Sequence, residues 1–195
     1  MCGITGAVWT DPRLNIAPKT LARMTSALAH RGPDSDGFFT SEMRLDAPAG
    51  AMPGVALGHR RLAIIDLAAS RQPMANEDGS VQVVFNGEIY NFRELRHRLE
   101  ANGHRFRSQG DTEVLVAIAI WDARHRRVVL ARDRMGQKPL VYRYESGRLL
   151  FASELKSLLA AEVPRKLDPA ALDEYLMYQY VPAPRTIFRG ISKLP

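Results

Sequence analysis

Short apolar runs separated by turn-forming residues are the feature that most constrains the fold of this chain. Most of these runs are too short for helices and favour buried strands. The stretch Asn76-Glu77-Asp78-Gly79 and the pair Ser146-Gly147 predict tight turns between consecutive runs. The pattern indicates a meander of mostly antiparallel strands. The predicted strands cover residues 4–9, 55–65, 81–85, 117–121, 127–132, 140–145 and 149–152.

Few helices are expected. Pro18 suits a first helical turn, and Leu21, Met24 and Leu28 follow on one face, which predicts a helix packed on the core. The fold class is therefore α+β with mostly antiparallel sheets. Further helices are predicted to begin at Asn91, with Glu94 as its capping partner, at Ser153, and at Asp168, with Leu172, Leu176 and Tyr180 at near-helical spacing. In residues 181–184 every second residue is proline, which predicts an extended linker.

The amino-acid composition limits the classes of protein to which this chain can belong. The chain has 195 residues and 46% hydrophobic content, enough for one domain or for a domain and part of a second. No apolar run approaches the roughly 20 residues that span a membrane, and no signal peptide is visible, so a cytoplasmic protein without membrane contact is expected. A single cysteine excludes a disulfide framework and a Cys-cluster zinc site, and the five histidines lack metal-ligand spacing. We expect chemistry without a metal or cofactor.

The basic charge raises nucleic-acid binding as an alternative. The net charge is +6, and arginines are dense between residues 93 and 127. Glu94, Glu100 and Asp122 are interspersed among them, however, and the aromatic residues do not alternate with arginines as a stacking platform requires. We therefore do not expect a nucleic-acid partner.

The only cysteine is Cys2. Removal of Met1 would place a thiol and a free amine on one terminal residue. A terminal amine titrates near ~7.7, so part of it is neutral at pH 7 and can accept the thiol proton. The competing interpretation is a small buried hydrophobic residue, which is the commoner fate of an isolated cysteine.

An ordered set of motifs resembles the class II glutamine amidotransferase domain, in the branch found in glutamine-hydrolysing asparagine synthetases. The Cys-Gly-Ile start and the Phe-Asn-Gly-Glu-Ile-Tyr-Asn stretch at 85–91 carry most of the likeness. Each motif alone is modest, whereas their order over nearly the whole chain is specific. The motifs occupy residues 1–6, 30–34, 59–62, 85–91, 110–113, 131–136, 138–140 and 151–154.

The resemblance implies an N-terminal nucleophile hydrolase fold, an αββα sandwich of two mostly antiparallel sheets with the processed terminus in a cleft. It implies hydrolysis of the glutamine side-chain amide to glutamate and ammonia through a Cys2 thioester. Residues 1–160 would form the glutaminase domain. Residues 161–195 would be a helix and linker leading to an ATP- and Mg-using synthetase domain in cis, of which no pyrophosphate-binding loop is present here. A homodimer is left open.

The same resemblance implies roles for individual residues. Cys2 would be nucleophile and base, while the Asn86 amide and the Gly87 N–H would hold the oxyanion. Without the flanking motif, Asn86-Gly87 would be an ordinary turn. Arg61 would bind the glutamine carboxylate through paired hydrogen bonds, and Asp111 would accept from its ammonium. Ile64 and Glu88 would add contacts, Arg60 would be a solvated surface charge, and residues 30–34 would form a loop over glutamine.

One departure from the family pattern favours a second hypothesis. Asp111 is followed almost directly by the apolar run that ends at Trp121, so a helix-sized segment near residues 114–117 is absent. That helix would normally orient Asp111. The alternative is therefore a degenerate, non-catalytic docking or regulatory module with the same fold.

Overall fold

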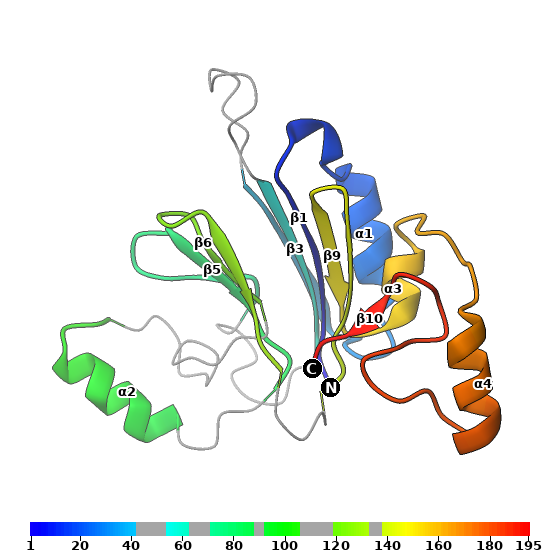
Figure 1. Cartoon of the computed structure of the whole chain (residues 1–195). Helices are drawn as coiled ribbons and strands as arrows, with labels where there is room; N and C mark the ends of the chain where they lie inside the picture. Colours follow the sequence, from blue (N-terminus) through cyan, green and yellow to red (C-terminus); the bar gives the residue numbers. More distant parts are fainter. Residues whose placement is uncertain (42–53, 63–70, 88–91, 106–118, 133–137) are drawn as a thin grey trace.

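Two antiparallel sheets form the centre of the molecule in the computed structural model, which describes residues 1–41, 54–62, 71–87, 92–105, 119–132 and 138–195. The sheets face one another, with α1 and α3 on the outer side of the larger sheet and α2 beside the smaller one (Figure 1). This arrangement confirms the predicted α+β class.

The larger sheet has the strand order β10-β8-β9-β1-β3-β2, and all its pairs are antiparallel. Strand β1 is central, with Gly3 opposite Arg60 on β3 and Thr5 opposite Ala152 on β9. The N-terminal residues therefore lie between strands from distant parts of the chain. The strands are β1 (Gly3–Trp9), β2 (Ser35–Thr40), β3 (Gly54–Arg61), β8 (Val141–Glu145), β9 (Arg148–Ala152) and β10 (Ser192–Lys193).

The smaller sheet has the order β4-β5-β6-β7. The predicted turn at residues 76–79 connects β4 and β5, and Gly79 has a positive φ of 75° that suits glycine. The strands are β4 (Met74–Ala75), β5 (Val81–Val84), β6 (Ala119–Asp122) and β7 (Arg127–Leu130). The helices are the short 3-10 helix η1 (Pro12–Leu14), α1 (Pro18–Ser26), α2 (Phe92–Ala101), α3 (Leu155–Leu159) and α4 (Pro169–Tyr178).

The core has two parts. One cluster includes Ile4, Leu57, Val84 and Phe151 and draws residues from both sheets. Each large side chain of this kind stabilises the fold by about 1.5–3 kcal/mol when fully buried. The second cluster joins the larger sheet to the helices, and it contains the predicted core positions Leu21 and Met24 of α1 together with Leu158 of α3.

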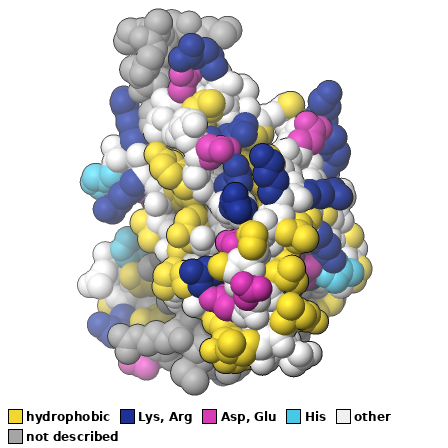
Figure 2. Space-filling model, turned by 45° about the vertical axis from the view of Figure 1, so that its right-hand side comes forward, with side chains coloured by type: hydrophobic (Ala, Val, Ile, Leu, Met, Phe, Trp, Pro, Cys, Tyr) yellow, Lys and Arg dark blue, Asp and Glu magenta, His cyan; other side chains and the backbone are white. Residues whose placement is uncertain are grey.

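Helix α4 differs from the other predicted helices. Asp168 caps it as predicted, accepting from the Ala170 N–H at 3.1 Å. Its apolar positions are exposed, however: Leu172 is 40% and Leu176 is 66% accessible, and only Ala171 is buried. In the view of the molecule in Figure 2, hydrophobic side chains gather together with acidic ones on the lower part of the surface. After α4 the chain returns to the larger sheet, where β10 pairs with β8.

None of the described helices combines the length and apolar character that crossing a membrane requires.

Candidate active site

Cys2 lies immediately before β1 and is partly buried. The Leu62 N–H donates to its Sγ at 3.4 Å, and the thiol lies 3.8 Å from the Leu62 carbonyl oxygen. These contacts place the thiol at the end of β3, one residue beyond Arg61.

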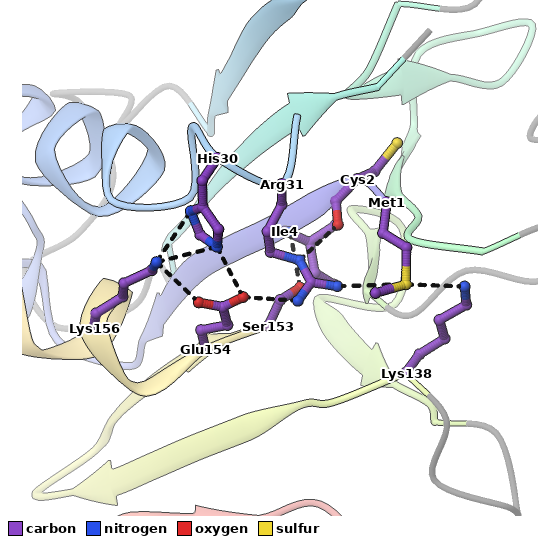
Figure 3. Close-up of polar contacts among 9 residues, drawn as sticks. All are labelled: Met1, Cys2, Ile4, His30, Arg31, Lys138, Ser153, Glu154 and Lys156. Carbon is purple, nitrogen blue, oxygen red and sulfur yellow. Dashed lines mark hydrogen bonds and ion pairs between the residues drawn. The ribbon is translucent and has the colours of Figure 1, made fainter. Parts of the chain in front are cut away.

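Arg31 holds the backbone of Cys2 (Figure 3). Its Nε donates to the Cys2 carbonyl oxygen at 3.0 Å, and its Nη1 donates to Glu154 Oε1 at 2.7 Å. The Arg31 side chain is only 8% exposed, so this ion pair is shielded from solvent on the arginine side. One residue beyond β9, Ser153 Oγ accepts the Ile4 N–H at 3.0 Å. The first residues are thus fixed from two directions.

Three cationic or potentially cationic groups contact the Glu154 carboxylate. Besides Arg31, His30 Nε2 lies 3.1 Å from Oε1 and Lys156 Nζ lies 3.2 Å from Oε2. Partial burial opposes ionisation, but hydrogen bonds from Arg31, His30 and Lys156 outweigh it and lower the pKa of Glu154 to about 2. The carboxylate is therefore charged at neutral pH.

Met1 occupies the space beside this network. Its Sδ lies 3.4 Å from Lys138 Nζ and 3.9 Å from Arg31 Nη2, and the residue is 54% exposed. With Met1 in place, the terminal amine belongs to Met1 and not to Cys2. Removal of Met1 would free the backbone nitrogen of Cys2 as the new terminal amine.

His59 links the larger sheet to the smaller one. It pairs with Ile4 across β1 and β3, so both side chains share the face that packs towards the smaller sheet. Strand alternation puts Arg61 on the same face, and Arg61 is only 6% exposed. The His59 Nε2 donates to the Phe85 carbonyl oxygen at 3.2 Å, directly before Asn86. Arg61 and Asn86 are therefore brought to the same side of β3.

Asn86 is buried, with 1% of its surface accessible. Its Nδ2 has no hydrogen-bond partner within the part of the chain that the structure describes. A buried amide donor without a partner is costly in a stable fold, and functional sites are one place where it occurs. At Gly87 an added Cβ would lie 2.5 Å from Cζ of the Phe85 ring. A side chain at position 87 would therefore require the buried Phe85 ring to move.

Three predicted substrate-binding residues, Ile64, Glu88 and Asp111, lie outside the described residues, as does the predicted missing segment near 114–117. Among residues that are described, no group of three potential ligands could hold a metal ion. The prediction for Arg60 was wrong. Its side chain is 14% exposed and donates to the Gly32 carbonyl oxygen at 2.8 Å, because the loop after α1 folds over it.

The sequence analysis gave Glu154 and His59 no role, and it included Arg31 only as part of the expected glutamine loop at residues 30–34. A charged residue within two positions of the end of an apolar strand, as Glu154 is, was the available signal. Its partner Arg31 lies 123 positions away, and no local pattern indicates that contact.

Comparison with known proteins decides the family. The family model described as a glutamine amidotransferase domain matches residues 1–118 and 115–195. The chain belongs to the glutamine amidotransferase domain family. Among solved structures, this amidotransferase domain is similar to glutamine phosphoribosylpyrophosphate amidotransferase from B. subtilis, with a TM-score of 0.62 and 19% identity over 86% of this chain and 46% of that one. That likeness establishes the predicted N-terminal nucleophile fold.

Sequence relatives of this amidotransferase domain carry the predicted branch in their names. It is 36% identical over 214 aligned residues to asparagine synthetase [glutamine-hydrolyzing] 1 of Bacillus subtilis (strain 168), covering all of this chain and 32% of that protein. It is 34% identical over 226 residues to a putative asparagine synthetase of Mycobacterium tuberculosis (strain ATCC 25618 / H37Rv), covering 34% of it. The chain thus spans about a third of the length of these relatives.

Proposed function

We propose that this domain hydrolyses the side-chain amide of glutamine to glutamate and ammonia through a thioester on Cys2. The observation that carries the proposal is the position of Cys2. Its thiol is the only one in the chain, and it would be on the terminal residue once Met1 is removed. The Leu62 N–H donates to the sulfur and Arg31 donates to the Cys2 carbonyl oxygen, so both the thiol and the backbone of Cys2 are held beside the ends of β1 and β3.

The proposed reaction begins after Met1 is removed. The Cys2 amine accepts the thiol proton, and Sγ attacks the amide carbon of glutamine. The leaving nitrogen of the tetrahedral intermediate takes the proton back from the Cys2 ammonium and departs as ammonia, which leaves the thioester and a neutral amine. Water then hydrolyses the thioester and restores the thiol. These reaction steps balance in atoms and charge without a metal or cofactor.

Asn86 and Gly87 are proposed to stabilise the oxyanion. The buried and unpartnered Nδ2 of Asn86 supports this role, because a substrate oxygen would supply the acceptor that the described residues do not. Removing one such donor typically costs about 10²–10³ in rate. We assign the glutamine carboxylate to Arg61, which is buried on the same face of β3 as His59, and its ammonium to Asp111, with further contacts from Ile64 and Glu88.

We further propose that the ammonia serves asparagine synthesis by an ATP- and Mg-using synthetase domain in cis, in the cytoplasm. The names and lengths of the relatives support this partner. The exposed apolar side chains of α4 also support it, because such a patch is usually covered in a functional assembly.

The experiment is glutamate release from glutamine by the purified chain and by Cys2→Ala. Alanine is also small enough at position 2 for methionine removal, so intact mass should show both proteins processed. We expect turnover in the first and none in the second, with Thr10→Ala at an exposed strand end as an active control. A processed, folded and inactive parent chain would contradict the proposal and favour the degenerate docking module.

A further inference from the structure

Two buried polar side chains bond the main chain of the same residue, Phe85. The His59 Nε2 donates to the Phe85 carbonyl oxygen at 3.2 Å, and Gln72 Oε1 accepts the Phe85 N–H at 2.6 Å. His59 is 1% and Gln72 is 8% exposed, so neither bond competes with bulk water. Phe85, one residue beyond β5, is therefore held at both its N–H and its carbonyl group by side chains from other parts of the chain.

The bond from His59 acts on the peptide that joins Phe85 to Asn86. Fixing the plane of that peptide constrains the direction in which the Asn86 side chain leaves the main chain, two residues beyond β5. The Asn86 Nδ2 is itself buried and lacks a partner among the described residues, so no described hydrogen bond orients the amide at its own end. The hydrogen bonds that constrain its direction therefore act on the main chain before it.

We infer that His59 and Gln72 are positioning residues that aim the Asn86 amide at the oxyanion. The inference rests on the proposed function of Asn86 and deepens it. Neither side chain touches the substrate in this arrangement. Both act through Phe85, and His59 also ties β3, which carries Arg61, to the oxyanion-binding turn.

His59 suits this task because it is neutral. Burial lowers its pKa to about 4, the hydrogen bond to Phe85 opposes the shift, and the nearby charge of Arg61 adds to it. At pH 7 a neutral ring with the proton on Nε2 donates one defined hydrogen bond to the carbonyl oxygen.

The first test is glutamine hydrolysis by His59→Leu, which removes the donor. Because the Asn86 donor is displaced and not deleted, we expect kcat to fall about 10- to 100-fold, with KM within about threefold of the parent. His59→Gln keeps an amide donor near the Nε2 position and should recover most of kcat. Gln72→Leu should reproduce the loss. Leu158→Ala, in the cluster against the helices, controls for lost core packing and should keep kcat.

The second test does not require turnover. The side-chain NH₂ signals of Asn86 are assigned by NMR in ¹⁵N-labelled protein through their loss in Asn86→Asp. We expect these signals to shift in His59→Leu and Gln72→Leu, but not in Leu158→Ala.

The two tests separate this inference from the proposed function. Unchanged Asn86 signals, or an unchanged kcat in His59→Leu while Cys2→Ala is inactive, would overturn the positioning role and leave the glutaminase proposal standing. An inactive parent protein whose Asn86 signals still depend on His59 would overturn the glutaminase proposal alone.

Discussion

Cys2 is held through its carbonyl oxygen by Arg31, and Arg31 is held in turn by Glu154. A backbone anchor of this kind leaves the thiol and the amine of the residue free to react. It also makes the position of the nucleophile depend on a carboxylate that does not contact the nucleophile itself. The ionised state of Glu154 matters here, because a carboxylate forms shorter and stronger hydrogen bonds with a guanidinium than a neutral acceptor does.

Glu154→Gln should lower kcat for glutamine about tenfold, because the weaker bond to Arg31 lets the Cys2 backbone shift. The measurement is steady-state glutamate release at saturating glutamine. Glu162→Gln is the matched control, since Glu162 pairs with Arg23 on the surface and is 78% exposed. Equal losses in both variants would show that the Glu154 pair has no special role.

Strand β1 is the element that carries Cys2 into the site, and close packing fixes it. At Gly6 an added Cβ would lie 2.5 Å from the Ala56 carbonyl oxygen on β3 and 2.5 Å from the Phe151 ring on β9. The glycine lets a bulky ring on one neighbouring strand cross over β1. The thiol is therefore placed by the register of three strands.

Gly6→Ala should destabilise the protein by about 1–3 kcal/mol or more, because the methyl group overpacks β1 against backbone and ring atoms. Gly79→Ala is the comparison: nothing lies within 4 Å of its added Cβ, so only its positive φ is penalised, at about 1 kcal/mol. Urea unfolding followed by tryptophan fluorescence measures both. A Gly6 variant as stable as the Gly79 variant would contradict the packing argument.

Helix α1 and most strands were predictable because their apolar pattern is local, whereas β2, β4 and β10 were not predicted. The burial of Leu21 and Met24 followed from their spacing alone. The exposure of Leu172 and Leu176 could not be predicted in this way, since the sequence pattern of an apolar helix face is the same whether or not another part of the protein covers it. The contacts of Arg31 with Glu154 and of His59 with Phe85 depend on how distant strands meet. Site residues came from motif resemblance, and their roles stay predictions.

Across the whole molecule, the two sheets are joined by apolar packing and by the buried bond from His59 to Phe85. The folded state keeps His59 neutral, whereas the unfolded chain protonates it below about pH 6.5. The unfolded state therefore binds more protons between pH 6.5 and about 4, so stability falls as pH falls through this window.

We expect the free energy of unfolding to be about 2 kcal/mol lower at pH 5 than at pH 7 because of His59. Glu154 loses its contribution only below about pH 4.5, which is outside the range compared. Urea titrations at both pH values test this. His59→Gln should remove most of the difference, while His125→Gln, at a 66% exposed side chain, should not. A pH dependence that survives His59→Gln would contradict the assignment.

The two chain ends lie close together (Figure 1). Arg132 donates to the carbonyl oxygens of Leu194 and Lys138, and Lys138 in turn contacts Met1. An affinity tag fused in front of Met1 would bury the future nucleophile inside a longer chain, and one fused after Pro195 would begin beside it. An affinity tag for purification or surface immobilisation should therefore be inserted in the turn at Gly79. There is open space at this position, and it is far from both termini in the sequence.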